Sequence, residues 1–387
     1  MPEDIKKKFS LKDLLFNKQK VEKIAQEIRA AYPEFDKKYF VKKTTHKFPV
    51  LELKERIGWI REVLKESLPE DYRKATSILI KSLPPACDKS KTDNDFGDFI
   101  YAPYADFVAQ FGRHKNDLQF SLDALKEMTT RFSAEDAIRY FINAHSDETI
   151  KIIQKWALDD HYHVRRLASE GTRPKLPWAQ KIVIPVEKPI SILDKLFFDK
   201  TRFVTRSVAN HLNDISKTNP ELVLGTLIKW RTSKKQHPDE MDYIIRHSLR
   251  TLIKAGHPET MRFLNFSPDT KVSLSDFKLK KQKVILGEFV EFEFILTAKQ
   301  TEKLLIDYTI YFRNHSGHNN NKKVFKLKQT EIKKNESISI NKRHRLMDNM
   351  TTRKLYPGKH YVEIQVNGKK LLKKEFELLI QKQDNTR

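Results

Sequence analysis

A repeat with a period of 40 residues constrains the fold of this chain more than any other feature. Three aspartates, three branched aliphatic residues and three arginines recur at this spacing: Asp159, Asp199 and Asp239; Val164, Val204 and Ile244; Arg166, Arg206 and Arg246. An aspartate ahead of a helix with a V-x-R core, at this period, is typical of HEAT-type helical pairs. Such pairs stack into a curved solenoid whose inner surface suits an elongated ligand. In a purely structural interpretation, each arginine ties its repeat to the aspartate of the next.

The pattern of apolar residues divides the chain into two parts. Residues 9–17 and 21–28 predict two short amphipathic helices, and from Leu51 to about Asn265 apolar residues recur at helical spacings of three and four. After Lys271, apolar and polar residues alternate as in strands, and Asn367-Gly368 predicts a tight hairpin. We expect a mostly α protein: residues 1–270 form a HEAT-like α-solenoid, and residues 271–387 form an immunoglobulin-like β-sandwich of six or seven strands.

The charge balance points to a polyanionic partner. Lysine and arginine number 74 against 51 aspartate and glutamate, a net charge of +23. Residues 271–387 hold 26 of the basic and 13 of the acidic residues, so more than half of the excess lies on fewer than a third of the residues. This favours nucleic acid over an anionic membrane. A solvated lysine-rich surface without a partner is the alternative.

Several absences narrow the compartment and the chemistry. Cys87 is the single cysteine, which favours a reducing, intracellular location. The first 40 residues lack a signal-peptide core, and no run of about 18 apolar residues occurs, so we expect a cytoplasmic protein that does not enter a membrane. The chain has no CxxC, HExxH or glycine-rich phosphate loop, and we expect neither a metal nor another cofactor.

The segment from Asp159 to Trp178, DDHYHVRRLASEGTRPKLPW, gathers acidic, basic and aromatic side chains where a helix gives way to a loop. We predict a helix that begins near Asp159 or Asp160 with an acidic cap and that Gly171 ends. Arg166 and Glu170 are four residues apart and share one face of this helix. The loop that follows carries Arg173, Lys175 and Trp178.

The repeat brings a second acid to the same place. It aligns Glu170 with Asn210, and Asp214 lies one turn after Asn210 on the face that Arg206 shares. Adjacent repeats present equivalent faces, so Glu170 and Asp214 should approach each other across the groove. Two carboxylates beside arginines suit stabilisation of a cationic transition state or positioning of water, while the arginines hold phosphates. Trp178 suits stacking on a base or sugar. The alternative is an ordinary Arg–Glu helix pair with a buried tryptophan.

Three segments, VRRLASEGTRPKLPWA, FVTRSVANHLNDISK and FSLKDLLFN, resemble the AlkC-type DNA alkylation-repair glycosylases, which belong to a superfamily of HEAT-like-repeat DNA glycosylases. The resemblance covers essentially the whole chain, including the immunoglobulin-like domain that one branch of the family carries. It implies a monofunctional enzyme that excises cationic N-methylated bases, 3-methyladenine and 3-methylcytosine, from double-stranded DNA. The base is not swung into a deep pocket, unlike in most glycosylases. The resemblance implies no cofactor, and we expect a monomer without an obligate protein partner.

The resemblance also implies roles for individual residues. The family's functional acids fall on Glu135, Glu170 and Asp214, and its aromatic residue on Trp178. The resemblance places contacts with the DNA backbone at Arg165, Arg166 and Arg173. We also expect Lys175, and from the repeat Arg206 and Asn210, to contact DNA. In two places the chain departs from the family: Lys175 stands where arginine is common, which loses the bidentate fork, and Tyr140 replaces a frequent proline near Glu135.

Two other functions fit the solenoid. A non-catalytic scaffold would bind damaged DNA without cutting it, although carboxylates in its groove would weaken binding to phosphates. A protein-interaction platform would bind its partner with little dependence on salt, whereas contacts to phosphates weaken steeply as salt rises.

Overall fold

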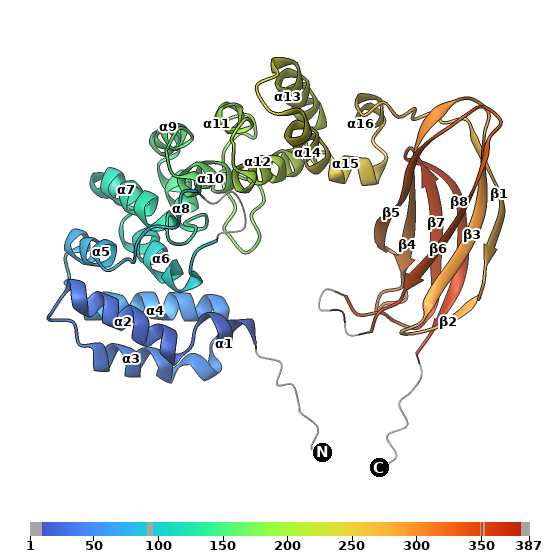
Figure 1. Cartoon of the computed structure of the whole chain (residues 1–387). Helices are drawn as coiled ribbons and strands as arrows, with labels where there is room; N and C mark the ends of the chain where they lie inside the picture. The colour runs from blue at the N-terminus through green and yellow to red at the C-terminus, as the bar shows by residue number, and fades with distance from the viewer. Residues whose placement is uncertain (1–9, 91–95, 349, 351–352, 381–387) are drawn as a thin grey trace, which may run out of the picture. The chain divides into compact units, whose positions relative to one another are not determined.

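The computed structural model describes residues 10–90, 96–348, 350 and 353–380 (Figure 1). The chain divides into two compact units, Met1–Ser248 and Leu249–Arg387. The change from helix to strand comes later, because the first strand begins at Val272, and two short helices therefore belong to the second unit. In the part of the chain that the structure describes, none of the helices has both the length and the apolar character needed to cross a membrane.

The first unit is helical. Its α-helices are α1 (Leu11–Leu15), α2 (Lys18–Ala31), α3 (Lys37–His46), α4 (Leu53–Ser67), α5 (Tyr72–Lys81), α6 (Ala102–Phe111), α7 (Leu118–Thr129), α8 (Ala137–Ala144), α9 (Ser146–Trp156), α10 (Tyr162–Glu170), α11 (Ile190–Leu196), α12 (Arg202–Ile215), α13 (Pro220–Ser233) and α14 (Pro238–Ser248). Short 3-10 turns are η1 (Phe48–Val50), η2 (Phe99–Tyr101) and η3 (Lys115–Asp117). Phe9, the first residue of the FSLKDLLFN segment, lies outside the described residues.

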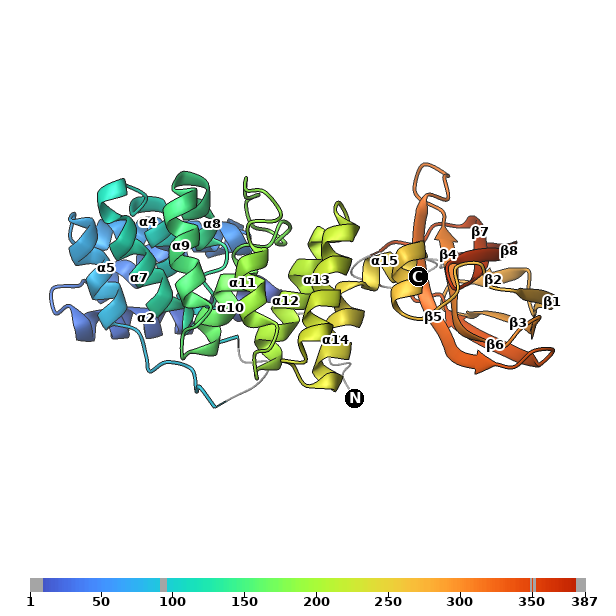
Figure 2. The same cartoon turned by 90° about the horizontal axis from the view of Figure 1, so that it is seen from above.

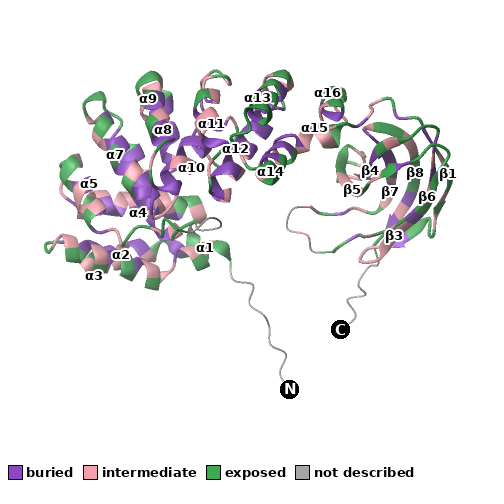
Figure 3. Ribbon diagram, turned by 45° about the horizontal axis from the view of Figure 1, so that its top comes forward, coloured by how far each residue is buried: buried purple, intermediate pink, exposed green. Residues whose placement is uncertain are grey.

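The helices form two layers, as in a HEAT-like α-solenoid. One layer contains α5, α7, α9, α11 and α13, and the other contains α6, α8, α10, α12 and α14 (Figures 1 and 2). Helix α12 packs between α10 and α14. Almost every residue of α10 and α12 is buried, because each is enclosed by neighbouring repeats (Figure 3). Functional groups on these two helices are therefore held by packing on most sides.

The 40-residue period appears directly in the helix starts. Helices α10 and α12 begin at Tyr162 and Arg202, and each follows an aspartate that accepts a backbone N–H two residues later. The third repeat differs, because α14 begins at Pro238 and Asp239 lies inside its first turn. An ion pair joins each repeat to the next: Arg165 pairs with Asp199, and Arg202 pairs with Glu240.

The described residues of the second unit form eight strands, one more than the upper limit we expected. Helices α15 (Arg250–Ala255) and α16 (Pro258–Phe263) precede β1 (Val272–Leu279), β2 (Lys283–Ile285), β3 (Phe289–Ala298), β4 (Glu302–Phe312), β5 (Asn321–Ile332), β6 (Ser337–Arg345), β7 (Gly358–Val366) and β8 (Lys369–Leu379). One sheet has the order β1-β3-β6 and the other β2-β8-β7-β4-β5. All pairs are antiparallel except β2 with β8.

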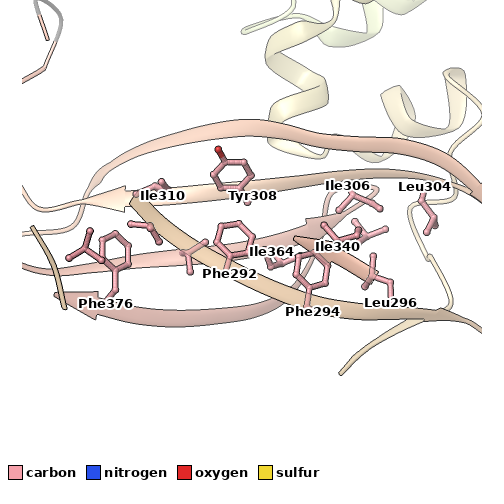
Figure 4. Packing of buried hydrophobic residues seen from close by; sticks show 14 of the residues in the cluster. Phe292, Phe294, Leu296, Leu304, Ile306, Tyr308, Ile310, Ile340, Ile364 and Phe376 are labelled. Atoms are coloured by element: carbon pink, nitrogen blue, oxygen red, sulfur yellow. The ribbon is translucent and has the colours of Figure 1, made fainter. Parts of the chain in front are cut away.

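The two sheets enclose one apolar core, as an immunoglobulin-like β-sandwich requires. Alternate residues of β3 and β4, including Phe292, Phe294, Ile306 and Tyr308, meet between the sheets (Figure 4). The predicted Asn367-Gly368 hairpin is confirmed, since both residues have positive φ, 50° and 83°. Gly368 must also remain small, because a Cβ there would lie 2.4 Å from the Cα of Gly256 at the end of α15.

Candidate active site

Helix α10 begins later than we predicted. It starts at Tyr162, and the N-cap is His161, whose Nδ1 accepts the backbone N–H of His163 at 3.2 Å. Asp159 stabilises the turn ahead of the helix, because its carboxylate accepts the N–H of His161 at 2.9 Å and pairs with Lys126 at 2.6 Å. The predicted acidic cap is therefore wrong, because His161 is the N-cap and Asp159 stabilises the turn before it.

Gly171 ends α10, as predicted, but not through left-handed backbone. Its φ of −64° and ψ of −27° are helical values. A Cβ at this position would lie 2.4 Å from the Cγ2 of Ile138 on α8. The glycine therefore permits the close approach of α8 to the end of α10, and this approach brings Glu135, just before α8, next to Arg166.

Arg166 lies between two of the three expected acids. Its Nη1 donates to Glu135 Oε2 at 2.7 Å and to Ser133 Oγ at 3.0 Å, and its Nη2 lies 3.9 Å from Glu170 Oε1. The guanidinium also lies over the ring of Phe203, 4.5 Å from its centroid. The side chain of Glu135 is 28 % exposed.

Arg173 continues this chain of alternating charge. It donates to Glu170 Oε1 through Nη1 and to Asp214 Oδ2 through Nε at 2.9 Å. The second oxygen of Asp214 accepts Lys217 Nζ at 2.8 Å. Glu170 and Asp214 are only 5 % and 6 % exposed. The expected approach of these two acids thus takes place through a shared arginine.

Glu170 is held as a carboxylate. Burial raises the pKa of this group, but the charges of Arg166 and Arg173 and a hydrogen bond from Ser207 Oγ at 2.5 Å outweigh it, so the pKa lies below its ordinary value. The group is therefore ionised at neutral pH and can offer negative charge, rather than a proton, to a reacting centre.

Three neighbours of the acids were missed by sequence reasoning. Ser207 donates to Glu170, and His211, one turn further along α12, is fully buried with Nδ1 3.1 Å from the carbonyl oxygen of Ser169. Arg139 on α8 donates to backbone carbonyls of the loop after α10. Only Arg139 left a signal, a lone charge in the apolar run AIRYFI. Ser207 and His211 look like ordinary helix residues.

Trp178 lies on the surface. It is 76 % exposed and has a φ of 64°, a left-handed conformation that costs energy for a residue with a Cβ. Its carbonyl oxygen accepts Lys54 Nζ, and the same ammonium lies 3.1 Å from Asp136 Oδ2. The alternative interpretation is an ordinary Arg–Glu pair with a buried tryptophan. Arg166 and Glu170 do form a pair, but the buried tryptophan is wrong, because Trp178 is exposed.

A small cavity adjoins Trp178. Its volume is about 150 Å³, and its wall includes Phe99, Phe132, Glu135 and Leu176. Ligand pockets usually measure about 300 to 1,000 Å³. This cavity is therefore small for a whole nucleotide.

The expected DNA-contacting residues have different surroundings. Arg165 is engaged by its own repeat and the next, with Nε 2.5 Å from Asp199 Oδ2 and Nη1 2.8 Å from the carbonyl oxygen of Asp159. Lys175 is exposed on the loop. Arg206 and Asn210 are half-buried on α12, and Asn210 Oδ1 lies 2.8 Å from His247 Nε2. Arg165 thus pairs with Asp199, whereas Arg166 and Arg173 pair with the acids of the cluster.

Two family models match the chain. Residues 108–251 match the family described as DNA alkylation repair enzyme, and residues 273–380 match the family described as the C-terminal Ig-like domain of the uncharacterised protein YhaZ. The first match contains the acidic cluster, and the second covers most of the β-sandwich.

Two similar proteins span nearly the whole chain. The uncharacterised protein YhaZ of Bacillus subtilis (strain 168) is 33 % identical over 359 residues, 92 % of this chain and 95 % of YhaZ. The Pseudomonas fluorescens alkylpurine DNA glycosylase AlkC, solved bound to DNA containing an abasic site analog, superimposes with a TM-score of 0.84 at 35 % identity, covering 96 % of this chain and all of AlkC. With this fold and these relatives along nearly its whole length, the chain belongs to the AlkC-type family of DNA alkylation repair enzymes, in the branch with a C-terminal immunoglobulin-like domain.

Proposed function

We propose that this chain is a monofunctional DNA glycosylase that hydrolyses the N-glycosidic bond of cationic methylated bases, 3-methyladenine and 3-methylcytosine, in double-stranded DNA. The observation that carries the proposal is the cluster in which Arg166 and Arg173 join Glu135, Glu170 and Asp214 on neighbouring repeats. Similarity to an alkylpurine DNA glycosylase along the whole chain supports the same activity.

The chemistry of the substrate explains why carboxylates suffice. A methylated base that already carries positive charge is a good leaving group, so the bond breaks without a strong acid. The positive charge then develops on the sugar, where fixed negative charge lowers the barrier. In this proposal Glu170 and Asp214 supply the negative charge. Glu170 suits this role because its lowered pKa keeps it ionised at neutral pH.

The water that attacks the sugar needs an acceptor. Glu135 assists here in the proposed mechanism, because it is the most exposed of the three acids and only its Oε2 is engaged by Ser133 and Arg166 among the described residues. We expect no lyase step, since no motif in the sequence singles out a lysine that would form a Schiff base.

DNA contacts complete the proposal. Trp178, exposed beside the cluster, would stack on the lesion nucleotide. Arg166, Arg173, Lys175, Arg206 and Asn210 would hold the backbone. The small volume of the adjoining cavity supports excision without a deep base pocket. For Arg165 the contacts favour a structural role, and its proposed DNA contact rests on the family resemblance.

The β-sandwich would contribute further backbone contacts. The edge strand β5 carries exposed Lys322, Lys323, Lys326 and Lys328. Lysines on an edge strand also prevent pairing with another sheet.

The experiment that tests the function is single-turnover release of free 3-methyladenine from methylated duplex DNA, with protein in excess. Release above the spontaneous rate, leaving abasic sites without strand cleavage, is the expected result. Tight, salt-sensitive DNA binding without release of the base would contradict the glycosylase function and support a non-catalytic DNA-binding scaffold. Binding to DNA that barely responds to salt would contradict both.

A further inference from the structure

The loop after α10 is held by one face of α8. Arg139 Nη1 donates to the carbonyl oxygens of Gly171 at 3.1 Å and Arg173 at 2.8 Å, and Nε donates to that of Gln180 at 2.5 Å. Asn143, one turn later on α8, donates to the carbonyl oxygen of Lys181 at 2.9 Å and accepts the N–H of Val183 at 3.1 Å. The two side chains thus fix both ends of the segment 171–183.

Arg139 is an unusual residue for this purpose. Its side chain is fully buried, and the three bonds given above all go to neutral backbone oxygens. Burying a charge without a carboxylate on its guanidinium is costly. A smaller polar residue could satisfy one carbonyl group, whereas the planar guanidinium of Arg139 donates to carbonyl groups near both ends of the loop at once.

The segment that Arg139 holds carries two groups of the candidate active site. Arg173, whose backbone carbonyl oxygen accepts a hydrogen bond from Arg139, joins Glu170 to Asp214 through its guanidinium. Trp178 lies between the two ends of the segment in its strained conformation. Lys54 supports that conformation from outside, through the carbonyl oxygen of Trp178.

We propose that Arg139 is a positioning residue for base excision: its guanidinium closes the 171–180 loop, so that Arg173 stays between the two acids and Trp178 points outward. The inference rests on the proposed function for its consequence in catalysis. The closing of the loop by Arg139, which we call the clamp, can be tested without measuring activity.

The test compares Arg139→Met with Arg56→Met in the full-length protein. Arg56 is the control, matched in burial and in backbone contacts: it is 2 % exposed and donates to backbone carbonyls of Leu51, Lys12, Phe16 and Phe48. Unlike Arg139, it also pairs with a carboxylate, Asp13, at 2.7 Å. Both variants lose a buried guanidinium and are expected to lose stability. Arg139→Lys is the conservative variant, which keeps the charge without the fork.

The first readout is hydrogen–deuterium exchange of peptides within 171–183, at temperatures chosen to give each variant the same global stability. We expect at least about 10-fold faster exchange in this segment for Arg139→Met, an intermediate effect for Arg139→Lys and none for Arg56→Met. Unchanged exchange in Arg139→Met, or an equal rise in Arg56→Met, would overturn the clamp.

The second readout is the single-turnover release rate per folded molecule, together with affinity for duplex DNA. We expect Arg139→Met to lower the rate on the order of 100-fold, as displaced catalytic groups do, while the affinity changes little. A wild-type rate in Arg139→Met would overturn the positioning role. If wild-type protein releases no base at all, the proposed function fails, and the exchange data still decide whether the clamp exists.

Discussion

Arg173 holds Asp214 by two points of one guanidinium, with Nε 2.9 Å and Nη2 2.8 Å from Oδ2. Its remaining nitrogen, Nη1, donates to Glu170. One arginine from the loop therefore joins the acid at the end of α10 to the acid near the end of α12. Since an arginine so placed satisfies two buried carboxylates, it should matter both for stability and for the geometry of the acids.

Replacing Arg173 by methionine should destabilise the helical unit by about 3 kcal/mol, because two buried carboxylates each lose one charged partner. Urea unfolding followed by far-UV circular dichroism measures this loss. The triple variant Arg173→Met/Glu170→Gln/Asp214→Asn should regain part of it, since no unpaired buried charge remains. Equal losses in the single and triple variants would show that the charges are not the cause.

Glu170→Gln and Asp214→Asn should each slow base release at least about 10-fold, which is roughly 1.4 kcal/mol of transition-state stabilisation. Binding to undamaged duplex should be retained or strengthened, because a negative charge facing phosphates is removed. Glu240→Gln is the matched control, since Glu240 pairs with Arg202 one repeat further along. Wild-type rates in both acid variants would move the chemistry away from this cluster.

Trp178→Ala should leave the free energy of unfolding within about 0.5 kcal/mol of wild type, because the side chain is exposed. The affinity for lesion-containing DNA should fall by about 1 to 3 kcal/mol if the indole stacks on a base. Trp178→Phe should retain most of the affinity. Val183→Ala, an exposed apolar side chain of the same segment, serves as the control. Unchanged affinity and rate in Trp178→Ala would remove the indole from the site.

His211 should make stability depend on pH. Burial, and after it the charge of Arg173, lower its pKa from 6.5 to about 4, although Asp214 and Glu170 oppose this. Between those values the unfolded chain binds more protons than the folded one, so stability is complete above pH 6.5 and falls as the pH falls. From pH 6.5 to 5 the loss should be about 1.5 kcal/mol.

The measurement is the difference between the unfolding free energies of wild type and His211→Asn across this range. Other histidines contribute equally to both proteins and cancel. The difference should shrink as the solution becomes more acidic. Parallel profiles for wild type and His211→Asn would refute the buried neutral histidine.

The sequence predicts the fold well where the pattern is periodic. The 40-residue repeat identifies the solenoid, and alternation in 289–296 and 360–366 identifies the sandwich, because packing imposes those periods directly. The alternation is obscured in strands β5 and β6, because lysines and other polar residues occupy their exposed faces.

The site shows a sharper limit. Arg165 and Arg166 are neighbours in sequence and differ by about 100° around a helix, so one faces Asp199 and the other faces Glu135. The repeat pattern selected Arg166 as the tie to the next aspartate, whereas Arg165 makes it. Sequence spacing also places Glu170 and Asp214 together without revealing that Arg173 joins them, because the path of the loop depends on Arg139.

The contrast between Arg165 and Lys175 gives a test of which cations meet DNA. Arg165 is bound to Asp199, which is almost fully buried, and Lys175 is exposed on the loop. Arg165→Gln should therefore destabilise the protein, on the order of 2 kcal/mol for a partly exposed pair, and leave the salt dependence of DNA binding unchanged. Lys175→Gln should leave stability unchanged and reduce the slope of log affinity against log salt by about 1, the loss of one phosphate contact. Titration of duplex DNA at several salt concentrations measures both slopes. A smaller slope in Arg165→Gln would return this arginine to the DNA-contacting set, because an ion pair with Asp199 that persisted in the complex would release no counterion from DNA.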